Sequence, residues 1–441
     1  MTTFARLWTP LHRLGWLPLS QAFSLVLSLV GFAVLSRLLG SASYAQFAVL
    51  VFVYTLSSLA TDLSAQGYVL VHGSSQWTRR AANRSALLSG VAGAILLALV
   101  LLFLNRLPLP LGPPTIVEML LLLVSLVFQS AVQPVRGSLL VQRHYGRAAS
   151  SDIISTAAGF AGSVALALHV HSPVVLCAQL AIVSVIRYMV ARAVLVRSMR
   201  ESFEEDFGRS TNDQGPIAFG LRVLPLNVAS YASRSIDSGI LPFILSPAAA
   251  ASYARSYQLI VTPITQVQLS LGGVIVERLA THARSSLSAT ADLPKRIWRV
   301  LSLTTFGSGL LLSVAAPAIQ DIFFGPGWFH VRVTIAAMAC ILPAMTLSAF
   351  IGWQLQVAGD VRSALVNLTV LMLVPFLAIL GGVLFAQDGA LVGLVLGALV
   401  QGIALAIAHR VLLPEGLKRS LIQIIVEWLV LFFLFAYALI P

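Results

Sequence analysis

Apolar runs of about 20 residues follow one another along almost the whole 441-residue chain. A helix of that length crosses the hydrocarbon core of a bilayer, which is roughly 30 Å thick. A transmembrane barrel would instead alternate polar and apolar residues in segments of about ten. Charged residues make up 10% of the chain, against about 25% in soluble domains. The sequence therefore predicts an all-α polytopic membrane protein.

We expect thirteen spans, and the thirteenth is unusual because it contains Glu427. Their expected limits are 19–38, 45–66, 85–104, 115–135, 149–168, 173–195, 217–238, 248–273, 297–319, 330–352, 363–385, 389–409 and 420–440.

Lys and Arg gather in alternate loops between these spans. If the N-terminus is cytoplasmic, 20 of the 28 lie on the inner side and 3 on the outer side. Positive residues favour the cytoplasmic side, so we expect this orientation. The net charge of +12 then reflects membrane topology and does not indicate nucleic-acid binding. The remaining five lie within spans: Arg187, Arg192, Arg222, Arg234 and Arg255.

The hydrophilic segment 197–216 separates the first six spans from the next six. Ser43-Tyr44-Ala45 and Ser252-Tyr253-Ala254 follow the first turn of each half, offset by 209 residues, so Gln46 corresponds to Arg255. Repeats of six spans share one orientation, which predicts a pseudo-two-fold axis along the membrane normal. The expected parts are an interfacial segment (1–18), a six-helix bundle (19–196), a cytoplasmic linker (197–216), a second six-helix bundle (217–409), and a cytoplasmic turn with an additional helix (410–441).

Charged side chains inside the seventh and eighth spans are the leading site candidates. Arg234 and Asp237 lie on a polar face of the seventh span with Asn227 and Tyr231, and Arg255 lies in the eighth. Charge within a membrane usually faces the bundle interior or a water-filled cavity. The alternative interpretation is an Arg234–Asp237 ion pair, three residues apart, that only neutralises itself.

Asp62 is the candidate for ion coupling, because a cavity-facing carboxylate can bind a proton or sodium ion. It shares a predicted face of the second span with Thr55, Ser58 and Gln66. The alternative is that Asp62 simply ends that span. Arg187 and Arg222 are expected in the inner half of the membrane.

Signals of soluble enzymes, metal sites and cofactors are absent from the sequence. It contains no H-E-x-x-H, P-loop or G-x-S-x-G motif, and its eight histidines are scattered at span ends. Cys177 and Cys340 both lie in apolar runs, which favours reduced packing residues. We therefore expect no catalytic residues, no metal and no cofactor.

Several motifs resemble bacterial polysaccharide and O-antigen flippases, the oligosaccharide flippase family. The C-terminal half carries Arg234-Ser235-Ile236-Asp237, similar to the family's Arg-Asn-Leu-Asp, followed by a turn and Tyr253-Ala254-Arg255-Ser256-Tyr257. Ser235 and Ser246 depart from the Asn and Gly that are usual in the family. Further matches are Arg37-Leu38-Leu39-Gly40, Thr61-Asp62-Leu63, Gly325-Pro326-Gly327-Trp328 and Ala358-Gly359-Asp360.

The family belongs to the multidrug/oligosaccharidyl-lipid/polysaccharide exporter (MOP) superfamily. The resemblance implies a V-shaped pair of six-helix bundles with alternating access. It also implies the flipping of a lipid-linked sugar, usually on undecaprenyl pyrophosphate, to the outer leaflet of the bacterial cytoplasmic membrane. The expected partners are this anionic glycan lipid, membrane lipids and other membrane proteins of polysaccharide assembly.

On this interpretation, arginines bind the anionic headgroup through paired charge-assisted hydrogen bonds. Arg222, with Arg187, would contact it from the inner side, and Arg234 and Arg255 near the outer side. Asp237 would tune Arg234, and aromatic rings would stack on sugars: Tyr231, Tyr253 and Tyr257.

Three alternatives remain open from the sequence. A drug/cation antiporter of the same superfamily would favour acidic cavity residues. A glycan polymerase or glycosyltransferase would carry a large outer loop, and no predicted outer loop exceeds roughly a dozen residues. A non-transporting scaffold would bind a partner through its inner loops.

Overall fold

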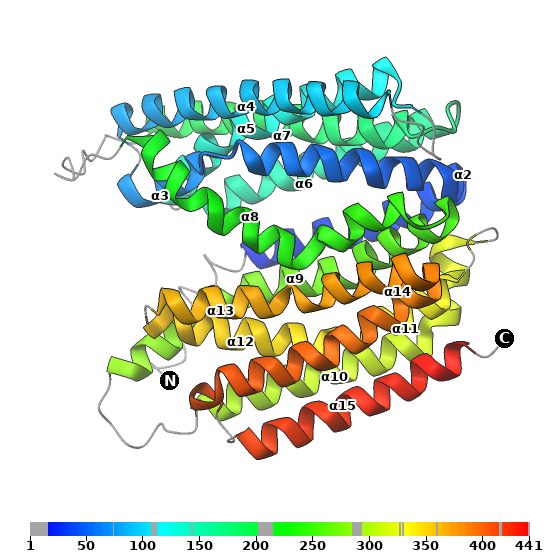
Figure 1. Cartoon of the computed structure of the whole chain (residues 1–441). Coiled ribbons are helices and arrows are strands. Elements are labelled where there is room, and N and C mark those ends of the chain that lie inside the picture. Colours follow the sequence, from blue (N-terminus) through cyan, green and yellow to red (C-terminus); the bar gives the residue numbers. More distant parts are fainter. Residues whose placement is uncertain are drawn as a thin grey trace, which may run out of the picture. The chain divides into compact units, whose positions relative to one another are not determined.

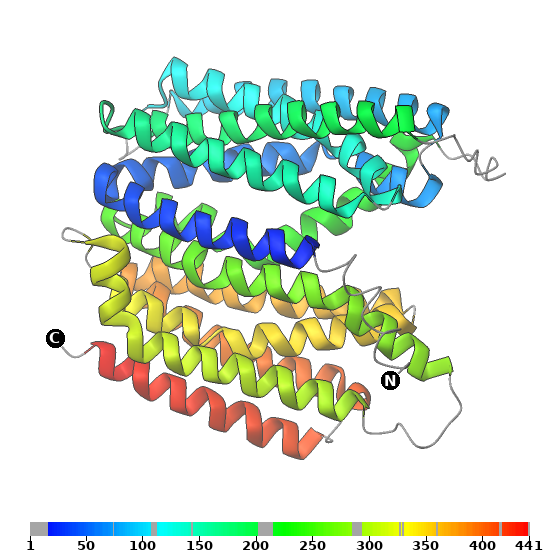
Figure 2. The same cartoon turned by 180° about the vertical axis from the view of Figure 1, so that it is seen from behind.

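The structure is a computed structural model, and every regular element in its described part is a helix (Figures 1 and 2). The predicted all-α polytopic class is thus confirmed. Within the described residues, eight helical segments are long and apolar enough to cross a membrane. The described residues are 16–73, 75–106, 113–142, 144–201, 215–284, 293–325, 328, 330–358, 360–413 and 417–439.

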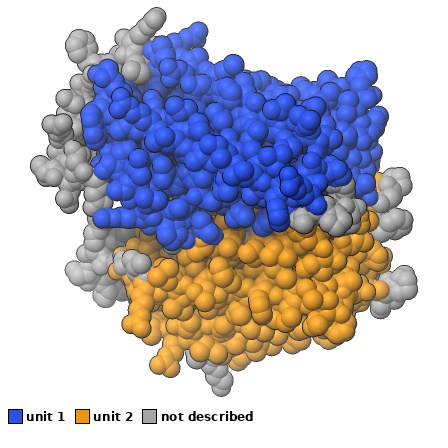
Figure 3. All heavy atoms as spheres, turned by 45° about the horizontal axis from the view of Figure 1, so that its top comes forward, with its two compact units in different colours: residues 1–228 blue, residues 229–441 orange. Residues whose placement is uncertain are grey.

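Two compact units divide the chain, Met1–Val228 and Ala229–Pro441 (Figure 3). The predicted second bundle begins at 217, so the observed boundary falls later, inside a helix. The predicted interfacial segment and linker lie mostly outside the described residues. The V shape and the pseudo-two-fold axis stay predictions.

The described part of the N-terminal unit consists of six helices and the first part of a seventh. These are α2 (Trp16–Ala60), α3 (Ala65–His72), α4 (Gln76–Leu104), α5 (Ile116–Val141), α6 (Tyr145–Ala167), α7 (Val174–Glu201) and the start of α8 (Pro216–Ile240). The first two predicted spans are the two arms of α2, which is kinked at Gly40 (φ 71°, ψ 173°). Glycine adopts positive φ at no steric cost, which explains the break at this position.

Small residues let the helices of this unit pack closely. The buried face of α6 repeats a small residue at every fourth position, and a Cβ on Gly159 would lie 2.3 Å from Val183 of α7. Close approach through small residues is the usual basis of helix packing in membranes, where lipid is as apolar as leucine. The repeated positions are Ser151, Ser155, Gly159, Ser163 and Ala167.

The first half of α8 packs on the break between α2 and α3, which explains the late unit boundary. A Cβ on Gly220 would lie 2.5 Å from the backbone of Leu63. Asn227 donates a hydrogen bond to the Ser64 hydroxyl at 3.2 Å. The Phe219 and Tyr68 rings meet edge to face, with centroids 5.9 Å apart.

The C-terminal unit holds the rest of the helices. They are the end of α8, η1 (Leu241–Phe243), α9 (Pro247–Arg284), α10 (Leu293–Ile319), η3 (Gln320–Phe324), α11 (Val331–Ala339), α12 (Leu342–Ala358), α13 (Val361–Leu371), α14 (Leu373–Ala408), η4 (Arg410–Leu412) and α15 (Leu417–Leu439). The predicted span 330–352 corresponds to α11 and α12, and it is the unit's core, since 83% of its most apolar stretch is buried.

A non-helical kink at Phe385 and Ala386 interrupts α14. A Cβ on Gly393 would lie 2.1 Å from the Leu377 carbonyl, so the segments on either side of the kink touch backbone to backbone. The predicted spans 363–385 and 389–409 meet at this kink. The thirteenth predicted span corresponds to α15, despite its internal glutamate.

Candidate functional site

The predicted site residues divide between the two units. Arg222 and Asp62 belong to the N-terminal unit, whereas the other predicted residues belong to the C-terminal unit. Arg222 is exposed on α8. The other six are Tyr231, Arg234, Asp237, Tyr253, Arg255 and Tyr257.

Asp62 does not lie within a helix. The second arm of α2 ends at Ala60, and Asp62 lies in a non-helical break before α3, where its carboxylate accepts a hydrogen bond from the Ser64 amide at 2.8 Å. The predicted helical face shared with Thr55, Ser58 and Gln66 is therefore wrong, because α2 ends just before Asp62. The alternative that Asp62 ends its membrane span stays a prediction. Ser89 of α4 donates to the Thr61 carbonyl and accepts from the Leu63 amide, so it satisfies the opened backbone. Ion coupling by Asp62 stays a prediction.

Asp237 and Tyr253 form the contact that anchors the predicted site in the C-terminal unit. Each is 2% exposed, and the Tyr253 hydroxyl donates to the Asp237 carboxylate at 2.5 Å. The Ser238 amide also donates a hydrogen bond to this carboxylate, at 2.8 Å. The side chain of Arg234 lies outside the described residues, so its predicted pairing with Asp237 stays a prediction. Because the Tyr253 ring is buried, this structure leaves no face of it open to a sugar.

Arg255 lies two residues beyond Tyr253 on α9 and is 9% exposed. Its guanidinium donates a hydrogen bond to the side-chain oxygen of Gln258, which lies on the same face. Tyr231 and Tyr257 are half-buried. Their predicted stacking on sugar rings stays a prediction.

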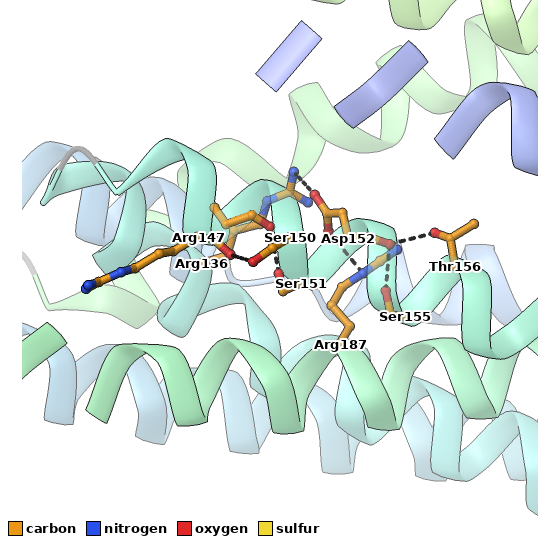
Figure 4. Close-up of polar contacts among 9 residues, drawn as sticks. Arg136, Arg147, Ser150, Ser151, Asp152, Ser155, Thr156 and Arg187 are labelled. Carbon is orange, nitrogen blue, oxygen red and sulfur yellow. Dashed lines mark hydrogen bonds and ion pairs between the residues drawn. The ribbon is translucent and has the colours of Figure 1, made fainter. Parts of the chain in front are cut away.

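The sequence did not reveal a cluster of charged side chains in the N-terminal unit. Asp152 of α6 pairs with Arg136 of α5, with Nη2 and Oδ2 3.0 Å apart, and with Arg187 of α7, with Nε and Oδ1 3.2 Å apart. Figure 4 shows the two arginines reaching the carboxylate from different helices. We call Arg136, Asp152 and Arg187 the N-unit triad.

Asp152 could have been found as an acidic residue within a predicted span. Arg136 follows the predicted end of its span at 135 and was counted with the inner loop. In the structure α5 continues through Pro134 to Val141. Proline is tolerated within membrane helices because neighbouring groups satisfy the freed backbone.

The N-unit triad carries two positive charges and one negative charge between packed helices. The side chains of Arg136, Arg187 and Asp152 are 31%, 21% and 18% exposed. They are therefore sheltered but still accessible. A partly desolvated pair of guanidinium groups with one excess positive charge favours an anion over a cation.

A chain of hydroxyl groups lies one helical turn from the triad. The Tyr54 hydroxyl contacts the Ser125 hydroxyl at 3.1 Å, and Ser125 contacts Ser184 of α7 at 3.0 Å. Ser184 and Arg187 are three residues apart and so share a face of α7. The wall beside the triad is therefore polar and hydrogen-bonding.

Metal binding has no support in the described part of the chain, where no three His, Cys, Asp or Glu side chains are grouped as metal ligands.

Comparison with protein families gives the decisive observation. The model of a family described as polysaccharide biosynthesis protein matches residues 34–332. The chain belongs to this family. Comparison with curated protein sequences gave no significant match.

Solved structures of MOP superfamily transporters share the fold of this polysaccharide biosynthesis protein. The lipid II flippase MurJ, in an inward closed conformation, matches with a TM-score of 0.65 and 12% identity, over 96% of this chain and 99% of that chain. The eukaryotic MATE transporter AtDTX14 matches with a TM-score of 0.62 and 15% identity, over 94% of this chain and 98% of that chain. A MOP superfamily transporter from Pyrococcus furiosus matches with a TM-score of 0.56 and 14% identity, over 97% of this chain and 96% of that chain. The chain is thus a multi-pass membrane protein with this superfamily's fold.

Proposed function

We propose that this polysaccharide biosynthesis protein flips a lipid-linked oligosaccharide of the undecaprenyl-pyrophosphate type from the inner to the outer leaflet of the bacterial cytoplasmic membrane. It works by alternating access, with its N-terminus in the cytoplasm. The family match supports a role in polysaccharide synthesis. The fold shared with a lipid II flippase is compatible with a lipid-linked substrate.

The N-unit triad is the observation that carries the proposal. A pyrophosphate is a dense anion, and guanidinium groups bind phosphate oxygens in pairs. Arg187 contacts Asp152 through Nε, so its two terminal nitrogens are not used in this ion pair. Asp152 thus holds Arg136 and Arg187 ready for an anion, and the phosphate oxygens then compete with its carboxylate.

The other proposed substrate contacts follow the sequence-based assignment. Arg222 meets the headgroup from the inner side, and Arg234 and Arg255 hold it nearer the outer side. Tyr231 and Tyr257 contact the sugar. Asp237 and Tyr253 position α8 against α9, because their buried hydrogen bond joins the two helices.

The alternative is a drug/cation antiporter, which the matches to MATE transporters support. A cationic substrate needs an available carboxylate. Asp152 is occupied by two arginines and Asp237 by Tyr253, so this arrangement favours the anionic substrate.

Complementation of a deletion strain tests the proposal. We expect R136Q/R187Q and R255A to abolish surface glycan while the protein reaches the membrane at wild-type levels. The lipid-linked precursor should accumulate in both strains. The control is R106Q, at an exposed position just after α4, which should support normal export. Normal surface glycan in both test strains would overturn the site assignment, and normal glycan in the deletion strain itself would overturn the function.

A further inference from the structure

Glu427 is a carboxylate near the midpoint of a membrane helix, and the proposed substrate site does not use it. It is the eleventh residue of α15, which runs from Leu417 to Leu439. Ten residues of helix measure about 15 Å, half the thickness of a bilayer core. An ionisable side chain at that depth marks a functional site by default.

Neutral side chains surround the carboxylate of Glu427. Its Oε1 accepts hydrogen bonds from the Ser302 hydroxyl of α10 and the Gln423 amide of α15, each at 2.7 Å. The Gln423 amide also lies 2.5 Å from the Ser302 hydroxyl. Unlike Asp152, which pairs with two arginines, Glu427 has two uncharged hydrogen-bond partners among the described residues. These partners can hold it in either protonation state.

Two stripes of buried and partly buried polar residues meet at Glu427. On α15, Ser420, Gln423 and Glu427 follow steps of three and four and share one face. On α10, the buried face carries Ser302, Thr305 and Ser313. By the predicted topology, the α15 stripe leads from the inner end of that helix to Glu427, and the α10 stripe continues towards the outer end.

Ser420 and Ser313 are 0% and 8% exposed, and their hydroxyl oxygens have no hydrogen-bond partner in the described part of the chain. Buried hydroxyl groups almost always have a partner, protein or water. One such group on each stripe therefore points to water or a transient proton donor on both sides of Glu427.

A neighbouring hydrogen-bonded set joins Thr305 of the α10 stripe to α9, the helix that carries Arg255. The Thr346 hydroxyl of α12 donates to Thr305 at 3.0 Å, and the Gln268 amide of α9 donates to Thr346 at 3.1 Å. These three side chains form a second hydrogen-bonded chain, one helical turn from Ser302 along α10, that reaches the helix of the proposed substrate site.

We propose that Glu427 is a proton-binding site of the C-terminal unit, at the join of the α10 and α15 stripes. A proton enters along the α10 stripe, converts the carboxylate to the carboxylic acid, and leaves along the α15 stripe, so the carboxylate is regenerated. The site itself is independent of the proposed substrate. Its use to drive transport rests on the proposed flippase function.

Charged and titratable side chains on α15 and on the helices that pack against it lie towards helix ends or, for Asp388, beside the internal kink of α14. Among described side chains, α12 contributes none. The others are Lys295, Arg296 and Arg299 on α10, Arg332 on α11, Asp388 on α14 with His409 at its end, and Arg419 and Tyr437 on α15 itself.

Glu427→Gln separates a proton-binding role from a purely structural one. Glutamine keeps an acceptor oxygen for Ser302 and Gln423, so the fold should be retained. Its amide binds no proton at the pH values of the titration. The matched control is Glu118→Gln. Glu118 is more deeply buried than Glu427, at 1% exposure, and it forms a capping box with Thr115, which glutamine can also complete.

The first measurement is infrared difference spectroscopy of the purified protein in lipid during a pH titration. We expect E427Q to lose one carboxylic-acid carbonyl band that wild type and E118Q retain, with unchanged melting temperature. The same bands in E427Q and wild type would overturn the proton site, whether or not the protein is a flippase.

The second measurement is flipping of a fluorescent undecaprenyl-pyrophosphate glycan in proteoliposomes, with and without a pH gradient. We expect the gradient to stimulate wild type and E118Q, while E427Q loses the stimulation and keeps its gradient-free rate. Equal stimulation of E427Q would overturn the coupling role. Absence of flipping by wild type would overturn the proposed function and leave the spectroscopic result intact.

Discussion

Removal of the shared carboxylate should destabilise the N-unit triad more than removal of either arginine. Asp152→Asn leaves Arg136 and Arg187 facing each other without their common partner. In Arg136→Gln, by contrast, Asp152 keeps Arg187. Two like charges in a sheltered site repel, whereas a residual ion pair is still neutral.

The exposures of the three side chains set the size of the effect. Breaking a fully buried pair costs about 3–5 kcal/mol, and a surface pair about 0–1 kcal/mol. With side chains 18–31% exposed, we expect Asp152→Asn to cost about 1–3 kcal/mol. We expect about 1 kcal/mol or less for Arg136→Gln, because one pair remains.

Added inorganic pyrophosphate turns this into a test of anion binding. If the two arginines bind the anion, pyrophosphate replaces the lost carboxylate and raises the melting temperature of D152N more than that of wild type. A ligand at 100 times its Kd stabilises by about 2.7 kcal/mol, enough to offset the expected loss. The assay is thermal unfolding of the detergent-solubilised variants.

The triple variant R136Q/D152N/R187Q is the control, since it has neither the repulsion nor the anion site. It should melt above D152N and show no shift with pyrophosphate. Equal melting temperatures of D152N and wild type, or equal pyrophosphate shifts in all variants, would refute the reasoning.

Three further predictions follow from single contacts. Gly220→Ala places a Cβ 2.5 Å from the Leu63 backbone and should lower the yield and melting temperature of purified protein. The control Gly307→Ala, where a Cβ meets nothing within 4 Å, should change neither, and equal behaviour of the two variants would refute close packing of α8. Tyr253→Phe leaves the buried Asp237 without its hydroxyl donor and should cost about 1–3 kcal/mol in thermal unfolding. The control is Tyr437→Phe, at a 74% exposed position, which should leave the melting temperature unchanged. An unchanged melting temperature of Y253F would contradict the contact. Hydrogen bonds from the Ser363 hydroxyl and amide lower the pKa of Asp360, which caps α13. The contribution of this cap to stability is therefore complete above about pH 4 and is lost as the pH falls through the lowered pKa. Hydrogen exchange of the Ser363 amide, corrected for intrinsic rates, should accelerate on acidification in wild type and be independent of pH in D360N.

The order of the spans was predictable from the sequence because the cost of unsatisfied backbone in lipid forces apolar runs into helices. The kinks of α2 and α14 fall where the sequence separates two spans, close to Gly40 and Phe385. The end of α5 was not predictable from Pro134, since its effect depends on which neighbours satisfy the freed carbonyl. The unit boundary inside α8 depends on the packing of Gly220 against Leu63, which no local pattern reveals.

The candidate site was predictable in kind and only partly in position. The sequence singled out Arg187, but the partnership with Arg136 and Asp152 joins three helices. Such long-range contacts leave no periodic signal. Asp237 was expected to pair within its own helix, at a spacing that sequence can detect. That pairing stays a prediction. The described contact of Asp237 with Tyr253, sixteen residues away on α9, depends on how the two helices meet.

Reconstituted flipping tests the central claim most directly. Proteoliposomes that contain the purified protein and a fluorescent undecaprenyl-pyrophosphate glycan report transfer between leaflets through quenching by a membrane-impermeant reductant. The account predicts protein-dependent transfer by wild type and R106Q, and none by R136Q/R187Q. Equal transfer by R136Q/R187Q, or transport of a lipophilic organic cation with no transfer of the glycan lipid, would contradict it.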